Sequence, residues 1–140
     1  MSPEEQKDLS RRSLGLWSSG STDRLEDLVA PDYTNHQEPH AKGGERTVGL
    51  EDWKDVLEGY HQAFSESEVT VLTEIVEGDR VAVHWEFTAR HTGDYLGRAG
   101  SGKSATWRGI TIDRFESGKI VETWTVWDKF GMFEDLGFVS

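Results

Sequence analysis

The residues best suited to acid/base chemistry lie on the last hairpin of the chain, whose two strands meet at a turn at 116–119. A three-residue loop with its glycine in the left-handed conformation sets the register of these strands. In this register Thr111 faces Thr125, and Asp113 faces Thr123, on one side of the hairpin. Hydroxyls and a carboxylate mixed with tryptophans are typical of the wall of a small-molecule pocket.

Asp113 is the first candidate for a catalytic base. No cationic residue stands opposite it in this register, and its expected neighbours are Trp107, Phe115 and Trp127. Burial among aromatic rings raises the pKa of a carboxylate towards the range useful for proton transfer near neutral pH. The alternative is an exposed carboxylate near the hairpin end that has no chemical role.

The other side of the hairpin carries charged pairs and an apolar band. Arg114 faces Glu122 and Arg108 faces Asp128, and an arginine opposite a carboxylate keeps that carboxylate ionised. Asp128 is therefore only the second candidate base, for the case that the register differs. If the threonine side lines the pocket, the band points away from it, and we expect a homodimer to cover it. The band consists of Ile110, Ile112, Trp124 and Val126.

Three helices are expected before the strands. Ser2 and Glu5 form a capping box around Pro3, which favours the first helical position. A short second helix is expected at 22–29. Apolar residues at intervals of three and four predict a long third helix at 50–64.

After the third helix the hydrophobic period changes to two residues. This pattern predicts four consecutive strands, and the order of helices followed by an antiparallel meander indicates an α+β fold. We expect one domain at 1–140, with three N-terminal helices against a curved, mainly antiparallel sheet that encloses a pocket. The residues at 130–138 form a short apolar lid or tail. The predicted strands are 68–77, 80–91, 104–116 and 119–128.

Composition narrows the function classes. The chain has 140 residues, the size of one domain, and a net charge of −11 that disfavours nucleic acid as a partner. The absence of cysteine excludes thiolate metal sites and a cysteine nucleophile. No apolar run is long enough for a signal-peptide core or a membrane span, so we expect a soluble, cytoplasmic protein. Six Trp, six Phe and three Tyr favour a pocket for a flat, apolar ligand.

Two groups of polar residues have spacings that metal sites use. His36, Glu38 and His40 alternate along one segment, and His84 and Glu86 share one face of a predicted strand. Neither group includes a third histidine at a defined spacing, so we expect no metal site. His84 and Glu86 belong to an outer polar face, or to a pocket edge if that face is reversed.

Several local strings, taken in their order and spacing, are typical of one family. They are Pro31-Asp32-Tyr33-Thr34-Asn35-His36, Arg90-His91-Thr92-Gly93, Leu96-Gly97, Gly102-Lys103, Gly118-Lys119-Ile120-Val121-Glu122-Thr123-Trp124, Asp128 and Leu136-Gly137. Over nearly the whole chain this pattern resembles the SnoaL-like polyketide cyclases. The resemblance implies the cystatin-like cone of the nuclear-transport-factor superfamily, frequent dimers, no cofactor, and aromatic polyketides as substrates.

The resemblance also implies roles for individual positions. The family's aldol cyclases use an aspartate on the last strand, supported by a histidine on the preceding strand, and these positions fall on Thr125 and Thr111 here. The pocket asparagine of the family matches Asn35, its aromatic residue at the end of the first helix matches Trp17, and a pocket position on the long helix matches Val56. Family members without the catalytic pair perform other steps in polyketide pathways, including hydroxylation.

Together these features predict a cofactor-independent enzyme that acts on a polyketide or a similar apolar carbonyl compound. Asp113 removes a proton next to a carbonyl and returns it to the new alkoxide, while Asn35 donates a hydrogen bond to the enolate oxygen. A hydroxylase-type family member and a non-catalytic binding protein are the alternatives. The candidate substrate contacts are Trp17, Tyr33, His36, Val56, Tyr60, His84, Trp107, Thr111, Thr125 and Trp127.

Overall fold

One six-stranded sheet forms the frame of the molecule. The computed structural model describes residues 1–19, 22–38 and 45–139. The strands follow the order β2-β1-β6-β5-β4-β3, and all neighbours are antiparallel except the parallel pair of β1 and β6. The elements are α1 (Pro3–Ser19), the 3-10 turn η1 (Leu25–Asp27), β1 (Val29–Glu38), β2 (Glu45–Val48), α2 (Leu50–Ala63), β3 (Phe64–Glu77), β4 (Arg80–His91), β5 (Ser104–Glu116), β6 (Lys119–Trp127) and α3 (Lys129–Leu136).

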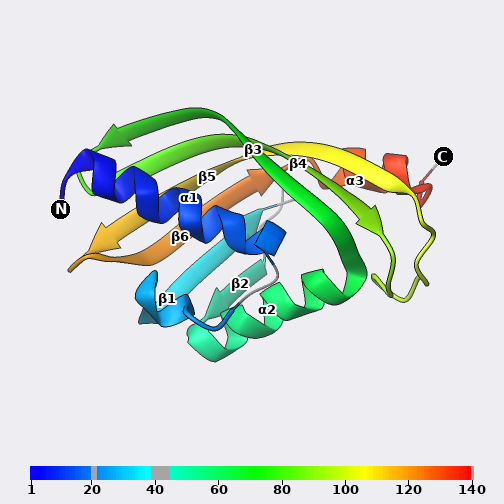
Figure 1. Cartoon of the computed structure of the whole chain (residues 1–140), viewed down its shortest axis with the longest axis horizontal. Coiled ribbons are helices and arrows are strands. Elements are labelled where there is room, and N and C mark those ends of the chain that lie inside the picture. Colours follow the sequence, from blue (N-terminus) through cyan, green and yellow to red (C-terminus); the bar gives the residue numbers. More distant parts are fainter. Residues whose placement is uncertain (20–21, 39–44, 140) are drawn as a thin grey trace.

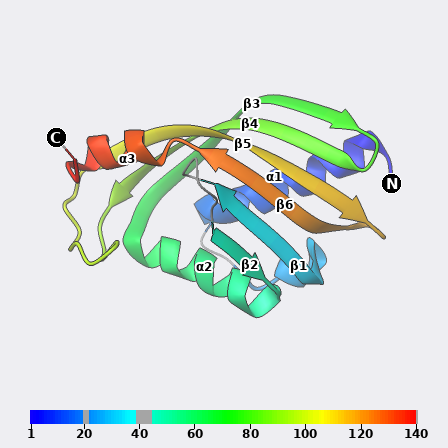
Figure 2. The same ribbon diagram turned by 180° about the vertical axis from the view of Figure 1, so that it is seen from behind.

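The helices leave one face of the sheet uncovered. Figure 1 shows α1 lying across the inner face of the curved sheet, with α2 below it and α3 at the far end of β6. Figure 2, seen from behind, shows the outer face of β4, β5 and β6 without a helix over it. This arrangement confirms the expected α+β fold with a curved, mainly antiparallel sheet. No helix formed by the described residues is both long and apolar enough to cross a membrane.

The core lies between the inner face of the sheet and the two long helices. In β4 every second residue from Val81 to His91 is buried, while the residues between them are half-buried or exposed. α2 contributes the buried Trp53 and Leu57 to the same core. Because strand side chains alternate between faces, this pattern directs one row of each strand inward.

The start of α1 confirms the capping box. The backbone N–H of Glu5 donates to Ser2 Oγ, and the backbone N–H of Ser2 donates to Glu5 Oε1, both at 3.1 Å. Two N–H groups at the helix start, which have no partner within the helix, are thereby satisfied.

The long helix predicted at 50–64 is observed as α2, but the predicted second helix and the predicted apolar tail differ from the prediction. The expected second helix is only the three-residue turn η1, and the segment predicted as an apolar tail contains a helix, α3. Asp128 caps α3 by accepting a hydrogen bond from the Gly131 N–H at 2.9 Å, and Gly137 ends it with a φ of 77°. The third helix of the structure, α3, is therefore the last element of the fold, and an N-cap residue and a left-handed glycine define its two ends.

The register of the last hairpin is as predicted, but its turn is shorter. Thr111 faces Thr125 and Asp113 faces Thr123. Glu116 pairs with Lys119, so the loop has two residues, both with positive φ, and a bulge between Arg114 and Phe115 restores the predicted register.

One of the two predicted charge pairs on the hairpin is formed. Arg114 contacts Glu122 at 3.2 Å. Arg108 instead pairs with Glu86 on β4 at 2.8 Å. Arg108 does lie opposite Asp128, whose backbone N–H donates to the Arg108 carbonyl oxygen at 3.0 Å. The predicted ion pair between their side chains is absent because the Asp128 carboxylate caps α3.

Gly109 is required for the packing of Trp85. A Cβ at position 109 would lie 2.6 Å from the Trp85 ring and 2.7 Å from the backbone oxygen of Val126. We expect Gly109→Ala to lower the free energy of unfolding by about 1–3 kcal/mol, because the buried indole must move. Urea denaturation measures this change. Gly59→Ala is the control: its Cβ meets nothing within 4 Å, so it should leave stability unchanged or raise it. Equal stability of Gly109→Ala and the wild type would contradict the argument.

The apolar band lies on the outer face, as expected if the threonine side is internal. Ile110 and Val126 are 49% and 56% exposed, and Ile112 and Trp124 are half-buried.

Because an exposed band of this kind favours association, we expect light scattering at micromolar concentration to give twice the mass of one chain. Val126→Lys should shift the protein towards the monomer. A monomeric wild-type protein would refute this prediction.

Candidate functional site

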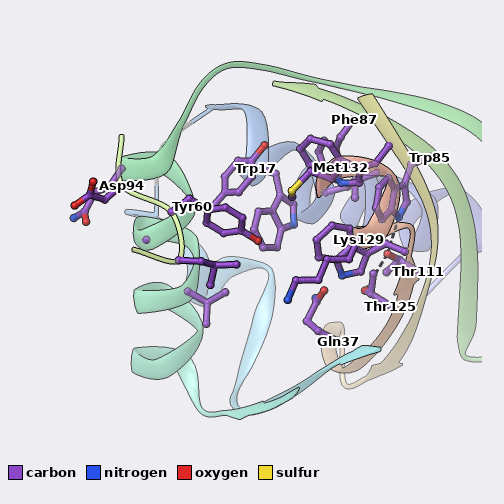
Figure 3. Close-up of a pocket in the computed structure, with 18 residues that line it drawn as sticks. Trp17, Gln37, Tyr60, Trp85, Phe87, Asp94, Thr111, Thr125, Lys129 and Met132 are labelled. Atoms are coloured by element: carbon purple, nitrogen blue, oxygen red, sulfur yellow. Dashed lines mark hydrogen bonds between the residues drawn. The ribbon is translucent and has the colours of Figure 1, made fainter. Parts of the chain in front are cut away.

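A cavity of about 480 Å³ opens between the inner face of the sheet and the helices. Trp17 at the end of α1, Val56 and Tyr60 on α2, and Met132 on α3 line it together with residues of β4, β5 and β6. Figure 3 shows Trp17, Tyr60 and Met132 facing a common space. The volume falls within the range of sites for drug-sized ligands.

Aromatic rings form most of the cavity wall. The Trp17 ring makes edge contacts with Tyr60 and Phe87, at centroid distances of 5.0 and 6.3 Å. Phe87 packs against Trp107 at 5.8 Å, and Trp107 against Trp127 at 6.1 Å. Rings that support one another hold a fixed shape, so the wall presents flat apolar surfaces to a ligand.

Two threonines form a polar pair in the part of the cavity wall that belongs to the sheet. Trp85 Nε1 donates a hydrogen bond to Thr111 Oγ1 at 2.8 Å, and Thr111 Oγ1 lies 3.1 Å from Thr125 Oγ1. Both threonines are buried by the protein and line the cavity. The Trp85 N–H occupies one acceptor position of Thr111. One threonine hydroxyl can therefore donate to the other, and the second hydroxyl hydrogen can point into one of the two adjoining cavities.

Asp113 lies behind this pair, in a second and much smaller chamber. The chamber measures about 20 Å³, and its lining includes Ser10, Asp113 and Thr123 as well as Thr111 and Thr125. The larger cavity shares both threonines with it, but Asp113 is not among the residues that line the larger cavity. The two threonines therefore stand between the large cavity and the carboxylate.

The environment of Asp113 suits proton transfer. Its side chain is buried, and its oxygens accept hydrogen bonds from Ser10 Oγ at 2.8 Å and from Thr123 Oγ1 at 2.6 Å. Burial raises the pKa of Asp113 to about 6, although the two hydroxyl hydrogen bonds oppose the shift. Around neutral pH such a carboxyl group can both accept and release a proton.

A row of polar side chains on β1 runs from the core to the cavity. Asn35 Nδ2 donates to the Tyr33 hydroxyl at 2.8 Å, and Gln37 Nε2 donates to Asn35 Oδ1 at 2.7 Å. Tyr33 and Asn35 are fully buried, and burial together with the nearby Asp113 carboxylate raises the pKa of Tyr33. Gln37 is the member of the row that lines the large cavity.

Six predicted site residues do not line the large cavity. Tyr33, Asn35 and Asp113 are buried in the core beside it, and the other three point away from it. His36 is on the outer face, with Nε2 2.8 Å from Glu122 and its ring stacked on Trp124 at 5.5 Å. His84 also faces outward, and Asp128 is exposed at the start of α3. Strand alternation explains both histidines, because residues 35 and 85 beside them point inward. The structure thus does not bring His36, His84 and Asp128 to the cavity.

Several lining residues were absent from the prediction. The alternation in β4 could have identified Trp85 and Phe87, and the cap at Asp128 could have located α3. No comparable sequence pattern indicated that Gln37 or the loop residues 94–96 would line the cavity. The additional lining residues are Leu14, Gln37, Gly59, Gln62, Trp85, Phe87, Asp94, Tyr95, Leu96, Lys129 and Met132.

No three His, Asp or Glu side chains converge on a possible metal site within 1–19, 22–38 and 45–139. His40, part of one predicted ligand spacing, lies outside these ranges.

Comparison with solved structures identifies close similarity of fold over the whole chain. AclR of Streptomyces galilaeus, a candidate hydroxylase, is 26% identical with a TM-score of 0.84, covering 99% of this chain and 89% of its own. IdmH of Streptomyces antibioticus, a candidate polyketide cyclase, is 26% identical with a TM-score of 0.79, covering 94% of this chain and 98% of its own. A candidate SnoaL-like polyketide cyclase from Jannaschia sp. CCS1, 19% identical with a TM-score of 0.85, covers 100% of this chain and 98% of its own and shares the fold.

The sequence itself gives the decisive match. None of the curated proteins matches this chain. The family model for the SnoaL-like polyketide cyclases matches residues 7–136, nearly the full length. With the cone-shaped fold and the aromatic cavity in place, this match shows that the chain belongs to the SnoaL-like polyketide cyclase family.

Proposed function

We propose that the protein is a cofactor-independent polyketide-tailoring enzyme that performs a cyclisation or a related acid/base step on an aromatic or apolar carbonyl compound. The observation that carries this proposal is a carboxylate with a pKa of about 6, separated from a large aromatic cavity by one pair of hydroxyl groups. Membership of the family and the similarity to IdmH support the substrate class.

Asp113 acts as the base through the threonine pair. The substrate proton passes to a threonine hydroxyl as that hydroxyl releases its own proton towards Asp113. The small chamber of about 20 Å³ has room for one water molecule, which can carry the proton from a hydroxyl to the carboxylate.

The proton follows the same route back after the new bond has formed. The electron pair of the broken C–H bond forms an enolate, whose carbon attacks a second carbonyl and leaves an alkoxide. Asp113 returns the proton to that alkoxide, so the enzyme ends in its starting state.

Asn35 supports the enolate oxygen through Gln37. The Asn35 amide nitrogen already donates to Tyr33, and its oxygen accepts one hydrogen of Gln37 Nε2. The second hydrogen of that nitrogen remains for an oxygen of the ligand, because a primary amide has two donors. Asn35 is therefore a positioning residue in this proposal.

Replacing Asp113 tests the proposed base. The protein is incubated with 2-tetralone, an aromatic ketone with acidic hydrogens beside its carbonyl, in heavy water, and deuterium uptake is followed by NMR. Asp113→Asn should slow the catalysed exchange about 10²- to 10⁴-fold, because Asn cannot accept a proton. Asp128→Asn is the matched control, since Asn also caps helices well, and should retain exchange. Unchanged exchange in Asp113→Asn would exclude this residue as the base.

The pH dependence gives an independent test. A carboxylate base is active when ionised, so exchange should rise with pH through about 6 and then level off. The folded protein binds a proton at Asp113 more tightly than the unfolded chain, so the free energy of unfolding should fall as pH rises from about 4 to about 6. Asp113→Asn should lose both effects, and urea titrations at several pH values measure the second. An identical pH dependence of stability in the variant would contradict the raised pKa.

Similarity to AclR favours hydroxylation as the second candidate function. A hydroxylase of this type would let the substrate carbanion react with oxygen instead of a second carbonyl. An oxygen electrode in the same incubations separates the two reactions, and we expect no oxygen uptake above that of ketone alone. Oxygen uptake that requires the protein would favour hydroxylation. Tight binding with neither exchange nor oxygen uptake would indicate a binding protein.

A further inference from the structure

Lys129 is the one cationic side chain among the described residues that line the large cavity. It is the first residue of α3, so the Asp128 cap determines where its backbone lies. Figure 3 shows Lys129 and Gln37 reaching towards the same part of the cavity, with Asp94, the one acidic lining residue of the described chain, at the opposite edge beside α2. The cavity therefore has a cationic side and an anionic rim.

Within the described part of the chain, no carboxylate lies within ion-pair distance of the Lys129 ammonium. The contact that this group does make is with an aromatic ring, since Nζ lies 5.5 Å from the centroid of Phe133. Such a contact leaves the N–H donors of the ammonium available. A positive charge beside apolar walls is screened less than one in bulk water, so its attraction to an anion is stronger.

Two further N–H donors belong to the same wall. Gln37 Nε2 uses one hydrogen for Asn35 and lines the cavity with the rest of its amide group. Trp127 Nε1 is buried without a hydrogen-bond partner among the described residues, and its indole lines the same cavity. A buried N–H without a partner has a cost in free energy that an acceptor on a ligand removes.

We propose that the cavity recognises a flat aromatic ligand bearing an acidic oxygen, a carboxylate or a phenolate, and that Lys129 binds this oxygen, while Gln37 remains the donor to the enolate oxygen. The inference rests on the proposed function and specifies its substrate class. The chain has a net charge of −11, which repels anions in general, so a local cation is needed to admit one. The aromatic walls hold the ring system, and the Lys129 ammonium determines its orientation.

A matched pair of fluorescent probes tests the anion site without requiring turnover. 8-Anilinonaphthalene-1-sulfonate and N-phenyl-1-naphthylamine share an aromatic framework, but only the first is an anion. Lys129→Met should weaken binding of the sulfonate about tenfold, the effect of losing one ionic hydrogen bond, and change binding of the neutral probe less than about twofold.

Two control variants complete the experiment. Lys54→Met removes the same charge from α2 at a position that does not line the cavity, and it should change neither affinity appreciably. Val56→Trp fills the cavity and should abolish binding of both probes. Circular dichroism and thermal melting confirm that each variant is folded.

The outcomes separate this inference from the proposed function. Equal sulfonate affinities of Lys129→Met and the wild type, or an equal loss for both probes, overturn the anion site but leave the proposed enzyme intact. Sulfonate binding that survives Val56→Trp places the anion outside the cavity and also overturns the inference. A wild-type protein that binds neither probe contradicts both the anion site and the proposed ligand cavity.

Discussion

The hydrogen bond from the Trp85 indole to Thr111 organises the inner face of the sheet. Gly109 has no side chain, so the indole can lie directly against the β5 backbone, where a Cβ would be only 2.6 Å from its ring. In that position Nε1 reaches Thr111 Oγ1 at 2.8 Å, and Thr111 meets Thr125 on the next strand. A glycine, a tryptophan and two threonines thus divide the interior into a large apolar cavity and a small polar chamber.

This division explains why two carboxylates on one hairpin differ in chemistry. Asp113 points inward, where burial raises its pKa to about 6 and the neutral hydroxyls of Ser10 and Thr123 donate hydrogen bonds to it. Glu122 points outward, and although partial burial opposes the shift, hydrogen bonds from His36 and Arg114 lower its pKa. The same residue class is therefore suited to proton transfer on one face and to structural pairing on the other.

The C-terminal helix α3 follows directly after the sheet and places two of its side chains at the cavity. The Asp128 carboxylate satisfies a backbone N–H of α3 and so fixes the direction in which the chain leaves β6. The next residue, Lys129, and the buried Met132 then reach the cavity from the same helix. One part of the cavity wall therefore belongs to a helix whose start is defined by a side-chain cap.

The sequence by itself determined the features that depend on neighbouring residues along the chain: the type of each long element, the start of α1 and the register of the last hairpin. Hydrophobic period separated the two long helices from the strands, and the Ser2 and Glu5 pattern defined the start of α1. The glycine turn predicted the register that places Asp113 opposite Thr123, although the loop is shorter than predicted and a bulge restores that register. Tertiary packing alone decided what surrounds Asp113: Ser10, which donates to it, is 103 residues away along the chain. It likewise brought Gln37 and Lys129 to one cavity. Local patterns specify which face of an element a residue occupies, but the neighbours across a core depend on how elements distant in sequence pack together.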